Sequence, residues 1–381
     1  MQTSLKIPLI ALALGALWGC TDSREATGPR PPAFSRTAVD GQPGAVYVAT
    51  NAAAGNEILA FPRAADGTLG EPSAFGTGGK GSGGGLGNQG GLVLTQGNRW
   101  LLAINAGSNE VSVFAVEPDG LKLTDRVSSG GEQPISVTAF HGLVYALNAG
   151  GAGNITGFRL SEDGRLGPLP HSTRPLSTSA AGPAQVGFSP DGEVLVVTEK
   201  AANTISTYVV EDDGRTDGPD PQPSVGKTPF GFAFSGRGTL VVSEAFGGAP
   251  GASALSSYDV RDSGELEVVS PSVGTTQTAA CWVVITRNSR FAYTTNTGSG
   301  TISGYSLSPA GVLTLLTHNG VNGTTGAGPI DMALSGNDRF LYALNSGAGA
   351  ISTFQVNSDG SLAPQTGATG LPAAANGLAA R

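Results

Sequence analysis

Residues 100–127 read WLLAINAGSNEVSVFAVEPDGLKLTDRV, which is three strand-like runs joined by two short polar turns. The runs alternate apolar with polar residues and are rich in Val, Ile and Leu, a pattern typical of β-strands. A further run of the same kind, GLVLT, precedes them. The stretch therefore predicts four consecutive antiparallel strands with the bounds Gly91–Thr95, Trp100–Asn105, Glu110–Val116 and Leu121–Val127.

The same pattern occurs seven times along the chain. Each copy has an aromatic residue with Ile, Val or Leu three positions before it and Gly six positions after it. The aromatic residues are Phe61, Phe114, Phe158, Tyr208, Tyr258, Tyr305 and Phe354. Their mean spacing of about 49 residues is typical of β-propeller blades. Four-stranded sheets that cannot bury both faces alone pack radially, so the sequence predicts one all-β domain, a seven-bladed β-propeller, over residues 44–381.

The two ends of the repeat region complement each other. The first copy begins at Gly44 with a second-strand pattern, VYVATN, and has no first strand. The C-terminal residues 376–381, NGLAAR, read like the first strand of the second copy. We expect the C-terminal strand to complete the first blade, because this leaves no open sheet edge in the ring.

The composition supports a turn-rich β protein and excludes some partners. Glycine accounts for 59 of the 381 residues, and only 13% of the residues are charged. In five copies Asp precedes the sixth-position Gly, and Asp-Gly pairs favour tight turns. The net charge is −8 and the basic residues do not cluster. Binding to nucleic acid, which depends on basic surface, is therefore not expected.

The N-terminus has the features of an export signal. Met1–Lys6 is a short polar start, and Ile7–Trp18 is an apolar run too short to span a bilayer. The run leads into Leu17–Cys20, which resembles the lipobox of bacterial lipoproteins. This resemblance implies removal of residues 1–19, lipidation of Cys20 and anchoring to the cell envelope (outer membrane or periplasm in a Gram-negative cell). Simple cleavage without acylation is the alternative. The proline-containing residues 20–43 then read as a flexible tether.

Four of the predicted second strands share a further motif, which carries a family resemblance. They end in VYVATN (46–51), VYALN (144–148), AYTTN (292–296) and LYALN (341–345). These endings resemble YVTN-type propeller repeats. The segment FSPDG (188–192) resembles the seven-bladed lactonase family, which includes 6-phosphogluconolactonases and carboxymuconate-lactonising enzymes. The resemblance implies hydrolysis or formation of a lactone at the central channel. Family members commonly carry a His-x-His pair ahead of this segment, where this chain has Gly182 and Ala184.

Two acidic residues stand out at the ends of the second strands, which we expect on one face, at the channel mouth. Five of the seven second strands end in Asn, which suits turns, but two neighbouring ones end in Glu199 and Glu244. A pair of carboxylates there could serve as acid and base or hold a divalent cation. We predict these two as the candidate catalytic residues. The alternative is a solvated charge, with Glu199 balanced by Lys200.

The first strands supply candidate ligand contacts. One early position is occupied by Gln185, Trp282 and Asp331 in three of the copies, and it is flanked by apolar residues. An indole there could stack on a sugar-like ring, although core packing would use the same residue. Together with Asn148 and Asn296 at the second-strand ends, these residues form the predicted binding set.

Other features narrow the chemistry. The glycine-rich run at residues 76–85, GTGGKGSGGG, predicts a flexible loop over this face, placed to cover a ligand. Cys281 is expected to be a small buried apolar residue. No two His are spaced as metal ligands, so we predict no metal site, and a divalent cation held by acids is the only cofactor left open. Two functions remain: a cell-envelope lactonase acting on a lactone or sugar-like ligand, or a non-catalytic envelope propeller that binds a small molecule, glycan or protein. Neither predicts an oligomeric state.

Overall fold

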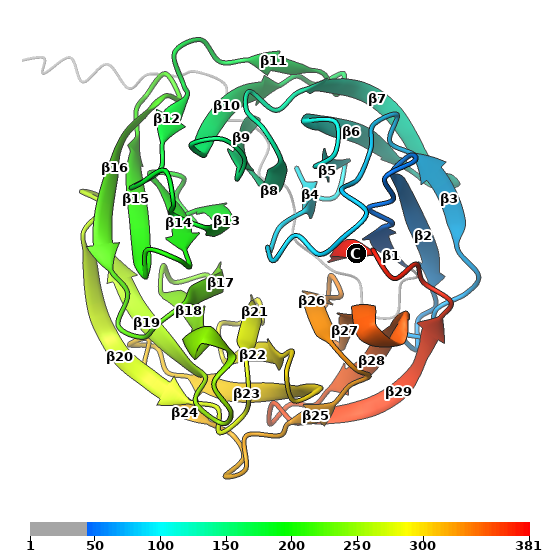
Figure 1. Cartoon of the computed structure of the whole chain (residues 1–381). Coiled ribbons are helices and arrows are strands. Elements are labelled where there is room, and N and C mark those ends of the chain that lie inside the picture. The colour runs from blue at the N-terminus through cyan, green and yellow to red at the C-terminus, as the bar shows by residue number, and fades with distance from the viewer. Residues whose placement is uncertain (1–43) are drawn as a thin grey trace, which may run out of the picture. The chain divides into compact units, whose positions relative to one another are not determined.

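The structure, a computed structural model, describes residues 44–381, which form seven antiparallel sheets around a common centre (Figure 1). The signal sequence, Cys20 and the tether predicted above lie outside the described residues. In each sheet the first strand is nearest the centre and the fourth lies at the rim (Figure 1). Within this part of the chain, no helix is long and apolar enough to cross a membrane.

Blade 1 combines the two ends of the described chain, and blades 2 and 3 are each built from consecutive strands. Blade 1 contains β30 (Asn376–Ala380), β1 (Gly44–Ala49), β2 (Glu57–Arg63) and β3 (Ser73–Gly76). Blade 2 contains β4 (Leu92–Thr95), β5 (Trp100–Asn105), β6 (Glu110–Glu117) and β7 (Gly120–Ser128). Blade 3 contains β8 (Pro134–Phe140), β9 (Leu143–Asn148), β10 (Asn154–Leu160), β11 (Leu166–Pro168) and β12 (Arg174–Pro175).

The other four blades follow in order. Blade 4 contains β13 (Pro183–Phe188), β14 (Val194–Glu199), β15 (Thr204–Val210) and β16 (Thr216–Pro223). Blade 5 contains β17 (Pro229–Phe234), β18 (Leu240–Glu244), β19 (Ala254–Val260) and β20 (Leu266–Gly274). Blade 6 contains β21 (Ala280–Ile285), β22 (Phe291–Asn296), β23 (Thr301–Leu307), β24 (Leu313–Leu315) and β25 (Gly323–Thr324). Blade 7 contains β26 (Pro329–Leu334), β27 (Phe340–Asn345), β28 (Ala350–Val356) and β29 (Leu362–Thr369).

The predicted seven-bladed propeller is confirmed, and so is its closure. The C-terminal strand β30 pairs antiparallel with β1, with Tyr47 opposite Ala379. The strands of blade 2 begin and end within one residue of the predicted bounds. In blades 3 and 6 the fourth strand is broken into two short pieces that both pair with the third strand. Two single-turn helices, Phe246–Gly248 and Ser346–Ala348, follow the second strands of blades 5 and 7.

The repeated residues hold neighbouring blades together. The seven repeat aromatics are all buried, with exposed fractions of 2% or less. Tyrosines of three of the four YVTN-like endings donate to the turn glycine of the next blade. Tyr293 Oη bonds the carbonyl oxygen of Gly360 at 3.0 Å, and Tyr342 Oη bonds that of Gly67 at 3.0 Å. Gly360 has a φ of 86°, and a Cβ there would lie 2.5 Å from the ring of Phe291. The repeat therefore encodes contacts between blades as well as strands.

Candidate functional site

The predicted binding residues of the first strands connect neighbouring blades at the centre of the ring. The Gln185 amide bonds the backbone of Phe232 in blade 5 in both directions, accepting from its N–H at 2.7 Å and donating to its carbonyl at 3.0 Å. Asp331 accepts from the N–H of Met332 at 2.8 Å and from that of Leu378 in β30 at 3.0 Å. The register of the neighbouring first strands shifts beside Phe232 and Leu378, which leaves a backbone N–H in each to be satisfied from the preceding blade.

Blade 5 lacks such a side chain, because its corresponding residue is Gly231. The amide of Gln89, which belongs to the segment between β3 and β4, takes the place of the missing side chain. The Gln89 amide accepts from the N–H of Val283 at 3.0 Å and donates to its carbonyl at 2.8 Å. A Cβ on Gly231 would lie 2.1 Å from Gln89 Oε1. The glycine therefore makes the room into which the glutamine side chain fits.

We call residues 86–90 the central segment, because this part of the chain reaches the middle of the ring in Figure 1 and bonds to first strands of different blades. Gln89 N donates to the carbonyl of Ala184 at 3.1 Å, and the carbonyl of Asn88 accepts from the indole of Trp282 at 2.7 Å. The segment thus bonds to blades 4 and 6. The loop predicted over this face, residues 76–85, contacts the second-strand ends of blades 1 and 2, where Gly81 N donates to the carbonyl of Ala52 at 2.9 Å. The central segment follows it and enters among the first strands. Positive φ angles at Gly87 and Gly90 (59° and 80°) let the backbone make this entry.

Lys200 is the cationic residue that contacts the central segment. Its ammonium donates to the carbonyl of Gly87 in the central segment and lies 4.7 Å from the ring centroid of Phe230. Phe230 in turn packs on Trp282, with ring centroids 5.1 Å apart. Within residues 44–381 no carboxylate lies within 4.0 Å of this ammonium. Lys200 is therefore a charge held against aromatic rings and a carbonyl oxygen, without an acid partner.

Burial sets the protonation behaviour of this cluster. It lowers the pKa of the Lys200 ammonium to about 8, because the charged form loses water. Burial also raises the pKa of the neighbouring Cys281 thiol to about 11. Cys281 is buried and unpaired, as the sequence predicted. A lysine with such a pKa changes charge near neutral pH, which is a property of functional lysines.

Sequence reasoning assigned Lys200 only as a counter-charge, although a signal was present. The residue after each second-strand end is small in all the other copies. These residues are Ala52, Ala106, Ala149, Ala245, Thr297 and Ser346. A single long cationic side chain in a series of small ones indicates a local function for that copy.

Glu199 and Glu244 are fully buried, each inside its own blade. The carboxylate of Glu199 accepts from the backbone N–H of Ser177 at 3.1 Å, from the hydroxyl of Ser177, and from Ser206 Oγ in β15 at 2.9 Å. Lys200, its neighbour in sequence, makes no ion pair with it. The carboxylate is therefore held by hydroxyl and amide donors rather than by a cation.

The second acid has a matching environment. Glu244 accepts from Gly226 N at 2.8 Å, from Ser272 Oγ at 2.6 Å and from Ser256 Oγ at 2.5 Å. The two carboxylates share no donor among the described residues. In the same part of the chain, no group of three or more His, Cys, Asp or Glu side chains is arranged to hold a metal ion. The predicted catalytic pair thus consists of two separately satisfied carboxylates.

The acids reverse the hydrogen-bond direction seen where the same position is Asn. Asn296 Nδ2 donates to Ser303 Oγ at 2.9 Å, and Ser303 passes the bond on to the carbonyl of Gly320 at 2.6 Å. In blade 4 the serine donates to Glu199 instead, because a carboxylate can only accept. Sequence reasoning recognised the substitution of acid for amide but could not assign this internal role.

The two predicted asparagines are likewise internal. Asn148 Nδ2 donates to Asn154 Oδ1 at 2.8 Å and to the carbonyl of Ser129 at 3.2 Å, and Asn296 also bonds Thr301 Oγ1 at 3.1 Å. Both are fully buried. Of the predicted residues, only Trp282 is therefore linked to Lys200, through Phe230 and the central segment, and the others are distributed around the ring.

Asp331 should make the stability of the ring depend on pH. Burial raises the pKa of its carboxyl to about 8, whereas an unfolded Asp titrates near 3.8. The folded chain then holds a proton that the unfolded chain releases, so stability falls as the pH rises from about 4 to about 8. We expect melting temperature to fall across this range in the parent, and less steeply in Asp331→Asn. Equal slopes in thermal unfolding at pH 5, 6, 7 and 8 would contradict this role.

Comparisons with known proteins identify the family. Residues 152–245 and 247–374 match the family model described as lactonase, seven-bladed β-propeller. The match spans more than half of the chain. The chain belongs to this lactonase family. In a sequence comparison with curated proteins, none matches it.

Solved structures share the lactonase-family fold across nearly their whole length. The periplasmic gluconolactonase of Pseudomonas aeruginosa is 17% identical, with a TM-score of 0.69, and the alignment covers 88% of this chain and 99% of that one. A 6-phosphogluconolactonase candidate from Bacteroides uniformis is 20% identical, with a TM-score of 0.67 and coverage of 89% and 99%. A protein from Lactobacillus plantarum is 16% identical, with a TM-score of 0.70 and coverage of 88% and 99%. At these identities the likeness concerns the fold.

Proposed function

We propose that this lactonase-family propeller acts on a lactone bound beside Lys200, Phe230 and Trp282. The observation that carries the proposal is the Lys200 ammonium, which rests on an aromatic ring, has no acid partner and already binds a carbonyl oxygen, that of Gly87. A lactone presents the same group. Its carbonyl oxygen gains negative charge when water adds, and a preorganised cation in a partly buried site stabilises that charge.

The reaction requires few groups from the protein. Water adds to the lactone carbonyl carbon, the ring C–O bond breaks, and a proton from that water passes to the released oxygen, which leaves a hydroxy acid. Lys200 would hold the carbonyl oxygen, and Phe230 with Trp282 would supply the apolar wall. In the structure the Lys200 ammonium donates to the Gly87 carbonyl. A substrate carbonyl would take the place of Gly87, so the central segment would have to move locally. Glu199 and Glu244 remain proposed acid–base residues, and their replacement by Gln is part of the test.

Lys200→Met should abolish most of the lactone hydrolysis. Methionine keeps the length and apolar character of the stem but removes the charge, and loss of one oxyanion-stabilising donor costs about 10²- to 10³-fold in rate. In the parent, enzymatic rate should fall as the pH rises through about 8, where the ammonium deprotonates. The measurement is a panel of aldonolactones and simple lactones, with spontaneous hydrolysis subtracted, on soluble protein that begins at Asp40.

The controls separate the roles of the acids from that of the lysine. Glu199→Gln and Glu244→Gln are assayed with and without divalent cations and chelator, after their folding has been checked. Turnover lost in either variant would support the acid–base role. Full turnover in Lys200→Met would overturn the assignment of this site.

The second candidate is a non-catalytic binding propeller. It is favoured by the anchored central segment and by the serine donors that satisfy both buried carboxylates. Absence of turnover on every lactone, with or without metal, combined with saturable binding of one of them, would support this function over hydrolysis.

We also propose, on the lipobox-like sequence at Leu17–Cys20, that the chain is exported and lipid-anchored to the cell envelope. The residues concerned lie outside the described part of the chain. Labelled fatty acid should be incorporated by the parent but not by Cys20→Ser. Equal labelling of the two would contradict the anchor.

A further inference from the structure

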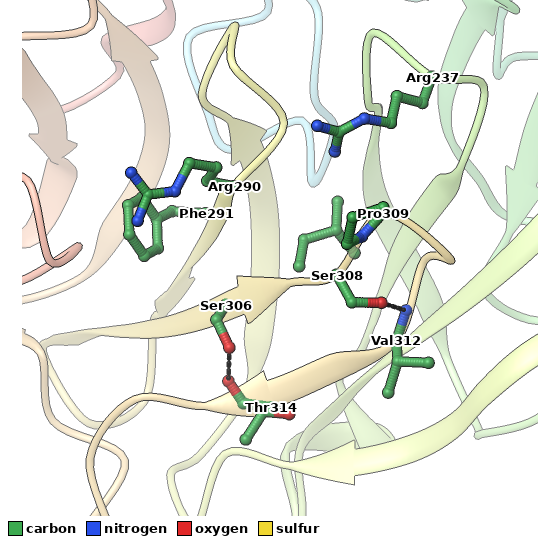
Figure 2. Close-up of a pocket in the computed structure, with 9 residues that line it drawn as sticks. Arg237, Arg290, Phe291, Ser306, Ser308, Pro309, Val312 and Thr314 are labelled. Carbon is green, nitrogen blue, oxygen red and sulfur yellow. Dashed lines mark hydrogen bonds between the residues drawn. The ribbon is translucent and has the colours of Figure 1, made fainter.

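A pocket of about 420 Å³ lies between blades 5 and 6 (Figure 2). Arg237 lines it from the turn between β17 and β18, and Arg290 from the turn between β21 and β22. Lys200 follows the end of a second strand, and the first-to-second-strand turns lie at the opposite ends of the strands. The pocket is therefore on the other face of the propeller from the proposed lactone site.

The charge of the pocket is positive, on a chain whose net charge is −8. No acid lines it. Arg237 Nη1 donates to the carbonyl of Ser289 at 3.2 Å, and the Arg290 guanidinium lies 5.1 Å from the ring centroid of Phe291. These contacts orient each guanidinium without neutralising its charge. Each guanidinium has five N–H donors, and these contacts leave some of them free for a ligand.

Most arginines of the described residues form no ion pair, so what distinguishes Arg237 and Arg290 is that both line one hollow. Within residues 44–381 the four ion pairs involve Arg126, Arg165, Arg215 and Arg261, each with a nearby acid. Arg237 and Arg290 are exposed, yet neither forms such a pair. Two unpaired guanidinium groups that line one hollow favour an anion, because they bind carboxylate and phosphate oxygens in a fork geometry.

The remaining wall adds hydroxyls and an apolar surface. Ser306, Ser308 and Thr314 line the pocket beside the arginines (Figure 2). Ser308 Oγ accepts from Val312 N at 3.0 Å and keeps its own proton free to donate. The Val312 side chain, 46% exposed, offers an apolar patch of the kind that the C–H face of a sugar ring covers. The volume falls in the range of small-molecule sites.

We propose that this pocket binds an anionic, hydroxylated ligand of sugar size, with its carboxylate or phosphate between Arg237 and Arg290. The three hydroxyls would bond the ligand's own hydroxyls, and Val312 would pack against its ring. This second site does not depend on the proposed lactone chemistry, because it shares no residue with the Lys200 cluster.

Isothermal titration of the soluble protein tests the proposal with three probes: glucuronate, glucose 6-phosphate and glucose. We expect saturable binding of at least one of the two anions, with the stronger one identifying the preferred acid group, and no binding of neutral glucose. Arg237→Gln and Arg290→Gln should each weaken anion binding about tenfold or more, the effect of losing a charge-assisted hydrogen bond.

The controls distinguish this site from other causes. Arg215→Gln and Arg261→Gln remove exposed arginines that are already paired with acids, and binding should be unchanged in both. Lys200→Met should also bind normally, so the lactone proposal can fail without affecting this one. Absence of binding by both anions, or binding that survives Arg237→Gln and Arg290→Gln, would overturn the proposal.

Discussion

Removal of residues 376–381 is expected to lower the melting temperature of the propeller by about 5 °C or more. These residues form β30, the innermost strand of blade 1, in which Asn376 and Leu378 are 6% and 5% exposed. Their loss would uncover β1, whose Val46 is fully buried, and would remove the partner of Asp331. Uncovering an inner strand costs several kcal/mol. At an unfolding entropy of about 2.1 cal/mol/K per residue, each kcal/mol corresponds to about 1.4 °C in a domain of this size.

The measurement is calorimetry of the shortened and full proteins, combined with limited proteolysis. A synthetic peptide of residues 371–381, added to the shortened protein, should restore much of the stability by pairing with β1. A scrambled peptide of the same composition is the matched control. A melting temperature within about 1 °C of the parent, less than one kcal/mol on the same scale, would show that ring closure contributes little.

Gly231→Ala is expected to destabilise the ring by about 3 kcal/mol, at the upper end of overpacking costs. The new methyl group would lie 2.1 Å from Gln89 Oε1 and 2.5 Å from the backbone oxygen of Cys281. The glutamine can move away, but the backbone of blade 6 cannot do so without disturbing β21. Expulsion of Gln89 would also leave the N–H of Val283 without its acceptor.

Urea unfolding of a small set of variants tests this prediction. Gly274→Ala, in the same blade, is the control, because a Cβ there meets nothing within 4 Å. Gln89→Ala should lower the free energy of unfolding less than Gly231→Ala does. The double variant should lose less than the sum of the two, because the new methyl group has no glutamine side chain to clash with. Additive costs in the double variant would argue against contact between these two positions.

The fold could be predicted from the sequence because each blade repeats its own local rules. Aromatic residues such as Phe114 mark buried third-strand positions, and glycines such as Gly120 mark the turns that follow them. These signals act over a few residues. The closing strand could be predicted as well, since a missing first strand at one end matched a surplus strand at the other.

The candidate site could be predicted only in part. Polar residues at one first-strand position indicated the centre of the ring, but not that Gln185 reaches into the next blade. The path of the central segment was not predictable, because Gln89 and its partner Val283 are 194 residues apart in the chain. Lys200 was predicted to balance the charge of Glu199 because the two are adjacent in sequence. In the structure the Glu199 carboxylate accepts from Ser206, and the Lys200 ammonium donates to the central segment.

The contact between Trp282 and the central segment gives the molecule a built-in optical signal. The full chain has three tryptophans, and protein that begins at Asp40 keeps Trp100 and Trp282. The indole N–H of Trp282 bonds the carbonyl of Asn88, and its ring adjoins Phe230, which carries the Lys200 ammonium. Any ligand that displaces the central segment must break this bond and change the surroundings of the indole, so the Trp282 part of the protein's emission reports occupancy without an attached dye.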